Sequence, residues 1–318
     1  MHKIMGNSLK YVKNNTKKTN VKIYEMFMRD GLQSFNKTFT LEKKLEFTKL
    51  LNQCGFHCIE LGSTVSPTLI PQMENSYELF KQTQKNPNTK YTMLVPGLFH
   101  ISKALQFAPT ITSFGLVCSV SDVFASKNQK KTAKDTLKNV FEQINLINTN
   151  LDKPHIRVYI SCSFGSPWEN FDNEYLSKLN FFTTELLQYA IKNKISSNDF
   201  DIVIADTVGL SSQDRIDKIL KMLWLDVCSD QVENEYFAMH IHSTEDKFKK
   251  IIGSCVLNNI FKFDSSMCGI GGCPFAEDNA LGNISTVSLI SFLQSLGYYK
   301  QIDIKYLEYI ENELKKLL

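Results

Sequence analysis

Short apolar runs rich in β-branched and aromatic residues recur along the chain, and polar or turn-forming residues bound each of them. Runs of this length and composition are typical of strands buried in a sheet. We predict such strands at residues 21–26, 57–63, 90–95, 111–117, 155–163, 201–207, 236–242 and 259–264.

Amphipathic segments lie between most of these strands. Residues 47, 50, 51 and 54 are apolar at the spacing of one helix face, and Gly55 follows where a C-terminal cap belongs. The same spacing returns after Thr132, with Asp135 three residues on, and after Ser211 and Ser212. Serine and threonine at these places can accept the first free N–H groups of a helix. Residues 288–318 are predicted to be a helix with a charged tail.

The alternation of strand and helix predicts parallel strands that are joined by right-handed crossovers. A count of eight favours a closed TIM (β/α)8 barrel with a C-terminal helical extension. An open doubly wound sheet is the alternative, but no GxGxxG follows the first strand and no GxxxxGK[ST] occurs. We expect residues 1–20 to form a flexible basic leader and residues 21–318 to form a single barrel domain that includes the C-terminal helices.

Composition and charge narrow the classes of partner. Apolar residues make up 43% of the 318 residues and charged residues 22%, which is the balance of a globular protein. The net charge of +3 is small for this length, so we expect neither nucleic acid nor a membrane as partner. No apolar stretch approaches the roughly 18 residues that a membrane-spanning helix requires.

The cysteines and the N-terminal segment bear on the compartment. The eight cysteines form no CxxC pair, which argues against a zinc ribbon and favours reduced thiols. Five of them are expected to be inert packing residues: Cys54, Cys58, Cys118, Cys228 and Cys255. The basic leader lacks arginine, which transit peptides favour. A cytoplasmic protein is therefore expected, with the mitochondrial matrix as the alternative if the leader is a transit peptide.

Polar side chains of the kinds that bind metals gather where the predicted strands end. In a (β/α)8 barrel these ends meet at one rim, which is where active sites form. His240 and His242 lie two residues apart on one strand, so both side chains point to the same face. His-x-His pairs also occur as surface or hydrogen-bonded residues, but Asp30 and Asn283 at neighbouring strand ends favour a mixed nitrogen and oxygen site. Such ligands suit Mg²⁺ or Mn²⁺, and the imidazoles leave Zn²⁺ open.

Two further side chains at this rim suggest chemistry. Arg29 could form only a surface ion pair with Asp30, but at a barrel mouth it is also placed to hold an oxyanion. Cys273 lies in the sequence GIGGCP, where glycines allow a mobile loop and a close approach of backbone to a ligand. A thiol in such a loop can donate or accept a proton.

The runs YEMFMRDGLQS, IELGSTVSPTLIPQM, IADTVG, AMHIHST, DSSMCGIGGCPFA and GNISTVSL occur in this order between residues 24 and 289. Together they resemble the 3-hydroxy-3-methylglutaryl-CoA lyase family. The RDG and His-x-His motifs alone would indicate only the wider superfamily of barrel metallolyases, which includes Claisen-type synthases and aldolases. The GIGGCP loop and the VSP…PQM segment are similar to the lyase branch.

The resemblance implies a metal-dependent enzyme that splits 3-hydroxy-3-methylglutaryl-CoA, or a close 3-hydroxy acyl-CoA, into acetyl-CoA and acetoacetate. It implies an acyl-CoA as substrate and a homodimer as assembly. The metal ligands that it implies are Asp30, His240, His242 and Asn283. It implies that Arg29 stabilises the enolate of acetyl-CoA, that Cys273 acts as acid or base, and that Asp30 and His240 also take part in catalysis. Substrate-binding or supporting roles are expected for Glu60, Asp206, Ser66 and Gln33.

The chain departs from the family pattern at three positions outside the implied ligands. Ser243 stands where the family has an aspartate, Gly97 where it has an asparagine, and Val287 where it has an acidic residue. Loss of such supporting groups weakens metal sites by roughly 10- to 100-fold. Two alternatives stay open: a related aldolase or Claisen-type enzyme with another substrate, and, because of these departures, a catalytically weakened barrel that binds a thioester.

Overall fold

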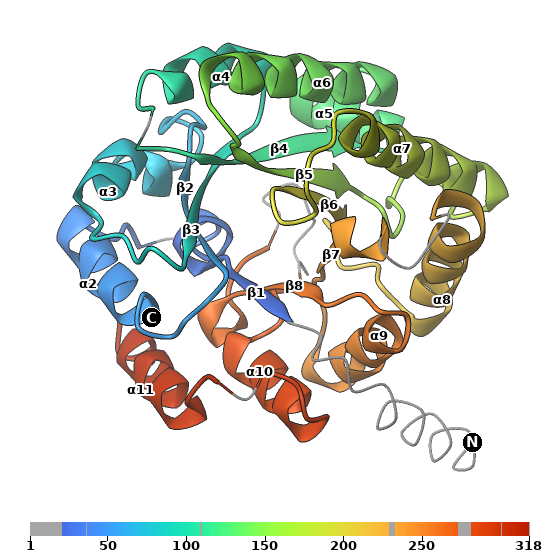
Figure 1. Ribbon diagram of the computed structural model, residues 1–318. Coiled ribbons are helices and arrows are strands. Elements are labelled where there is room, and N and C mark those ends of the chain that lie inside the picture. The colour runs from blue at the N-terminus through green and yellow to red at the C-terminus, as the bar shows by residue number, and fades with distance from the viewer. Residues whose placement is uncertain are drawn as a thin grey trace.

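Eight parallel strands close into a barrel, and helices surround it (Figure 1). The structure is a computed structural model that describes residues 21–35, 37–108, 110–228, 233–272, 281–299 and 301–317. Each strand pairs with its neighbour in chain order, and β8 pairs with β1 to close the ring. The predicted closed barrel is confirmed, and the alternative of an open sheet is wrong. The strands are β1 (Lys22–Glu25), β2 (Cys58–Ser63), β3 (Lys90–Val95), β4 (Ser113–Ser119), β5 (His155–Ser161), β6 (Phe200–Ala205), β7 (Phe237–His240) and β8 (Lys262–Ser265).

The strands lie where the sequence predicts them, but several ends differ. The last strand begins at Lys262 and not at residue 259, because Asn259 has a φ of 56° and belongs to the turn after a helix. The seventh strand ends at His240, so His242 lies beyond it and is held by an isolated bridge to Asn283.

The helices form the outer layer, and their predicted caps are partly confirmed. Thr132 accepts the N–H of Asp135, and Ser212 accepts the N–H of Arg215, as expected for N-caps. The helices are α2 (Leu41–Leu51), α3 (Ser76–Gln82), α4 (Leu98–Leu105), α5 (Asp122–Gln129), α6 (Ala133–Asn150), α7 (Asn173–Lys192), α8 (Gln213–Met222), α9 (Glu245–Leu257), α10 (Thr286–Ser295) and α11 (Ile304–Lys315).

Two helix predictions need correction. The first helix ends at Leu51, so Gly55, with a φ of 73°, serves the turn that follows and does not cap the helix. The single helix predicted from residue 288 is two helices, α10 and α11. Gly297, with a φ of 91°, ends the first of them, and the side chain of Asp303 accepts an N–H at the start of the second.

Five short helical turns are described besides the α-helices. The most important for the site is η1 (Phe27–Gly31), a π-helical turn directly after β1. The others are η2 (Pro71–Met73), η3 (Leu223–Val227), η4 (Glu233–Tyr236) and η5 (Met267–Gly269).

The barrel interior contains a charged network as well as apolar side chains. Arg157 on β5 is completely buried, and its guanidinium lies 3.5 Å from the centre of the Tyr24 ring. It donates to Asp201 at 3.0 Å and to Asp264 at 2.6 Å. Lys262 also donates to Asp201, at 2.5 Å. The buried charges are thus paired, as burial requires.

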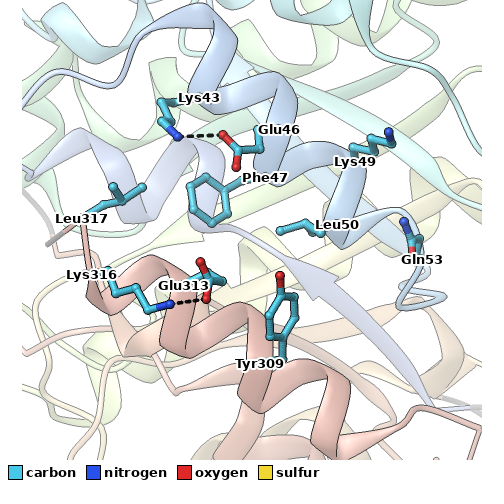
Figure 2. Close-up of a pocket in the computed structure, with 10 residues that line it drawn as sticks. All are labelled: Lys43, Glu46, Phe47, Lys49, Leu50, Gln53, Tyr309, Glu313, Lys316 and Leu317. Carbon is cyan, nitrogen blue, oxygen red and sulfur yellow. Dashed lines mark hydrogen bonds and ion pairs between the residues drawn. The ribbon is translucent and has the colours of Figure 1, made fainter.

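The C-terminal helix packs against the first helix of the outer layer, and a groove of about 450 Å³ runs between them (Figure 2). Tyr309 on α11 points toward Leu50 on α2 across it, and the ion pairs Lys43–Glu46 and Lys316–Glu313 lie along its two walls. None of the predicted site residues lines this groove.

The remaining expectations meet the structure only in part. Four of the five predicted packing cysteines are buried, whereas Cys228 is only partly buried. Over the described ranges no helix is both long and apolar enough to cross a membrane. The leader at residues 1–20 lies outside the described residues, and a single domain over residues 21–318 stays a prediction.

Candidate metal centre and active site

Three of the predicted metal ligands meet at the C-terminal ends of the strands. Asp30 lies in the turn η1, His240 ends β7, and His242 follows two residues later. The Nε2 atoms of the two histidines are 3.0 Å apart, and each lies 4.0 Å from Oδ2 of Asp30. All three side chains are buried. Ligand atoms bonded at about 2.0–2.2 Å to one ion are separated by roughly these distances, so the three groups fit a divalent cation.

Hydrogen bonds fix the tautomers of both histidines. Nδ1 of His240 lies 3.1 Å from the carboxylate of Asp264, and Nδ1 of His242 lies 2.8 Å from the carbonyl oxygen of Leu281. A carboxylate and a carbonyl only accept, so each Nδ1 carries the proton and donates. Both Nε2 lone pairs therefore point at the same place beside Asp30. This convergence is what a metal site requires and what a purely structural histidine pair would avoid.

The electrostatics of the cluster favour positive charge at its centre. Burial alone would raise the pKa of Asp30, but Arg29 and the two imidazoles outweigh burial and hold that pKa below its usual range. Burial likewise opposes protonation of His240, yet Asp264 and Asp30 raise its pKa. The pKa of His242 is lowered by burial and by the charge on His240. The carboxylates of Asp30 and Asp264 therefore favour positive charge where the two imidazoles meet.

Arg29 lies in a buried pair of ion pairs beside this cluster. Its Nε donates to Oε2 of Glu60 at 2.5 Å, and a terminal nitrogen donates to Oδ1 of Asp30 at 2.5 Å. The surface ion pair considered from the sequence is thus wrong, because both partners are buried. Burial raises the pKa of Glu60, and Arg29 offsets part of that rise. Tyr159 donates to the other oxygen of Glu60 at 3.4 Å. Its ring lies between two guanidinium groups, 6.0 Å from that of Arg29 and 5.5 Å from that of Arg157.

Asn283 also reaches the cluster, with its amide nitrogen as the nearer group. That nitrogen donates to Oδ2 of Asp30 at 2.6 Å and to the carbonyl oxygen of Ile270 at 3.0 Å. A ligand role would require the amide oxygen to face the cation, so the role of Asn283 stays a prediction. Gly271 explains how the glycine loop comes so close: it has a φ of 130°, and a Cβ on it would lie 2.1 Å from this nitrogen.

Of the other predicted site residues, Gln33 contacts the cluster, and Asp206 and Ser66 form hydrogen bonds within their own loops. Gln33 donates to Oδ1 of Asp30 at 3.2 Å. Asp206 instead closes the turn after β6, where it accepts the N–H groups of Leu210 and Ser211 at 2.7 and 2.9 Å. Burial raises its pKa. Ser66 is exposed on the loop after β2, and its hydroxyl accepts the N–H of Thr68. Cys273 lies outside the described residues.

The PQM sequence has a structural role near the site. The amide of Gln72 donates to the carbonyl oxygens of Phe35 and Lys37, and it accepts the N–H of Phe39. These bonds fasten the segment that follows η1 to the loop after β2. The chain that directly follows the Arg29 and Asp30 turn is therefore held in place by Gln72.

Sequence reasoning missed the residue that orients His240. Asp264 on β8 is buried between His240 and Arg157, and it bonds to both. It begins the DSS sequence, but a lone acidic residue in an apolar strand does not reveal its partner. The detectable signal was a set of charged residues, Arg157, Asp201 and Asp264, at positions where the strand pattern calls for apolar side chains.

The fold and the cluster together define a class. A closed (β/α)8 barrel with a buried carboxylate and two imidazoles at its C-terminal rim, next to a buried arginine, is an enzyme scaffold with a site suited to a divalent cation. The chain belongs to the HMGL-like family, whose model matches residues 20–313. Its membership makes the chain a lyase.

Known relatives agree with this assignment at modest identity. Over 285 residues the chain is 30% identical to the cytoplasmic 3-hydroxy-3-methylglutaryl-CoA lyase of Rattus norvegicus, covering 89% of this chain and 77% of that protein. It is 26% identical over 283 residues to a 3-hydroxy-3-isohexenylglutaryl-CoA/hydroxy-methylglutaryl-CoA lyase of Pseudomonas aeruginosa, covering 89% and 88%. A crystal structure of hydroxymethylglutaryl-CoA lyase from Pseudomonas aeruginosa superposes with a TM-score of 0.81 at 25% identity, covering 94% of this chain and 93% of the other.

Proposed function

We propose that this lyase cleaves a carbon–carbon bond of 3-hydroxy-3-methylglutaryl-CoA in a metal-dependent reaction, and that it releases acetyl-CoA and acetoacetate. The observation that carries the proposal is the convergence of the lone pairs of His240 and His242 beside Asp30, with Arg29 adjacent. The names of the relatives support the substrate.

Asp30, His240 and His242 would hold the ion, with Asn283 as a fourth ligand through its amide oxygen. The mixed ligand set suits Mg²⁺ or Mn²⁺, with Zn²⁺ as the alternative. When bound, the ion would polarise the 3-hydroxyl group of the substrate as a Lewis acid. The fixed Nδ1–H groups keep both imidazoles ready for this role.

The protein's own groups carry the proton and charge changes. His240 takes part in removing the proton of the 3-hydroxyl group. The oxygen then forms the new ketone of acetoacetate, and the electrons of the broken bond move onto the thioester as an enolate. Arg29 stabilises that enolate, because its planar guanidinium carries more N–H donors than its two carboxylate partners occupy. Cys273 then returns a proton to the enolate carbon, which completes acetyl-CoA.

The test is release of acetyl-CoA from purified protein supplied with Mn²⁺ or Mg²⁺. His240→Ala should abolish release, Arg29→Gln should lower it by at least about 10²- to 10³-fold, and Cys273→Ser should slow it severely. Arg215→Gln is the control, because Arg215 on α8 donates to the carbonyl oxygen of Phe164 and lies over the ring of Phe171. That variant should retain activity.

The same assay separates the alternatives when it is run on a small substrate panel. A 3-hydroxy acyl-CoA with a larger 3-substituent and a 4-hydroxy-2-oxo acid should react more slowly than 3-hydroxy-3-methylglutaryl-CoA. Reaction of the 2-oxo acid alone would establish an aldolase instead. Binding of the thioester without any turnover would establish a non-catalytic barrel.

A further inference from the structure

Glu25 is a buried carboxylate with no cationic partner among the described residues. It is the last residue of β1 and is completely buried. Tyr24 packs inside the barrel over Arg157, and side chains alternate along a strand. Glu25 therefore faces the opposite side, toward the helix layer, where apolar residues are the rule.

This carboxylate accepts hydrogen bonds from three separate segments. Oε1 accepts the N–H of Phe27 at 3.0 Å and the N–H of Met267 at 3.0 Å. Oε2 accepts the hydroxyl of Thr286 at 2.5 Å. The three donors come from the turn η1, from the turn η5 after β8, and from the first residue of α10.

Each of these segments also carries a group of the candidate metal centre. Asp30 lies three residues after Phe27 in η1. Asn283 lies three residues before Thr286. Ile270, whose carbonyl oxygen accepts the amide of Asn283, lies three residues after Met267. Glu25 is thus one anchoring point for three pieces of chain that converge on the cluster, although it touches none of the predicted ligands.

We propose that Glu25 is a positioning residue that holds the Asp30 turn, residues 267–272 and the Asn283 segment in fixed positions relative to one another, and so sets the metal affinity of the site. The inference rests on the proposed function, since it assigns those segments to a metal centre. An apolar residue would fill this place with less desolvation, so the carboxylate is explained by the three bonds that it accepts.

Two substitutions at Glu25 separate the effect of its hydrogen bonds from the effect of its negative charge. In Glu25→Gln the amide oxygen can accept both N–H groups, and the amide nitrogen can donate to the Thr286 hydroxyl, which then donates to Ser265, 2.9 Å away. Glu25→Met has a similar volume and removes all three bonds. Thr286→Val removes only the hydrogen bond between Glu25 and α10. Thr183→Val is its matched control, because Thr183 is equally buried on α7 and its hydroxyl bonds only within its own helix.

The experiment measures Mn²⁺ affinity of the full-length protein by calorimetry, together with hydrogen exchange of residues 26–33, 266–272 and 281–286. Glu25→Met should weaken Mn²⁺ binding by about 10- to 100-fold, the range for supporting groups around a metal. Glu25→Gln and Thr183→Val should bind as the wild type does, and Thr286→Val should lie between. Amide exchange in all three segments should quicken together in Glu25→Met.

Unchanged Mn²⁺ affinity in Glu25→Met overturns the proposal, as does faster amide exchange that is confined to residues 26–33. If Glu25→Met does not fold, the comparison of Thr286→Val with Thr183→Val decides in the same way. A wild type that binds Mn²⁺ but does not cleave the thioester refutes the proposed function and leaves this test intact. A wild type that binds no Mn²⁺ refutes both.

Discussion

The bond between Asp264 and His240 predicts an informative substitution, Asp264→Asn. The new amide has the same shape, but it presents one acceptor and one donor where the carboxylate presents two acceptors. Arg157 only donates, so it requires the amide oxygen, at the place where the carboxylate now accepts it at 2.6 Å. The amide nitrogen then faces Nδ1 of His240, and that atom must become the acceptor.

The consequence is a change of tautomer in His240. Its proton moves to Nε2, the atom that now lies 3.0 Å from Nε2 of His242 and points at the predicted cation. A protonated nitrogen cannot bind a metal ion. We expect metal affinity to fall by about 10- to 100-fold, which corresponds to about 1.4–2.8 kcal/mol. The free energy of unfolding should also fall by about 3 kcal/mol, because a buried charge loses one of its two ionic partners.

The assay pairs Mn²⁺ titration with ¹⁵N spectra of the histidine rings in metal-free protein. Asp201→Asn is the control, because Asp201 also pairs with Arg157 but bonds to His155 and Lys262 and not to His240. It should lose stability and keep its metal affinity nearly unchanged. Wild-type affinity in Asp264→Asn, or a proton that stays on Nδ1, would refute the tautomer argument.

Three other predictions follow from single residues. Arg29→Gln should lower the rate of acetyl-CoA release by at least about 10²- to 10³-fold without loss of the circular dichroism spectrum, because it removes a donor to the developing enolate; a smaller effect would contradict that role. Burial raises the pKa of Glu25 to about 7 from an ordinary 4.5, so the folded state binds this proton more tightly. Its stabilising contribution, about 3 kcal/mol, should be complete below pH 4.5 and be lost as the pH rises through 7; denaturant unfolding at several pH values should show this slope in the wild type and lose it in Glu25→Gln. Gly271→Ala should displace Asn283 and weaken metal binding measured by calorimetry, because the new methyl group would lie 2.1 Å from the amide nitrogen; unchanged affinity would show that the loop yields at no cost to the site.

The barrel and the residue types at its rim could be predicted from the sequence. Strand and helix periodicity depend on neighbours a few residues apart, so the eight strands and the caps at Thr132 and Ser212 could be predicted from the sequence. The shared face of His240 and His242 follows from the alternation of side chains along extended backbone. Charged residues within apolar strands were equally visible, but their partners were not.

Which of these residues act together depends on how the closed barrel brings distant strands into contact. Asp264 meets His240 because β7 and β8 are neighbours, and it meets Arg157 because β5 faces it across the barrel. Glu25 reaches Met267 and Thr286 because closure of the ring places β1 beside β8. A side chain's hydrogen-bond partners depend on which strands the closed sheet brings together, and this information is absent from any local window of sequence. The pattern of residues therefore predicted the candidate ligands, and the closure of the barrel selected the groups that orient them.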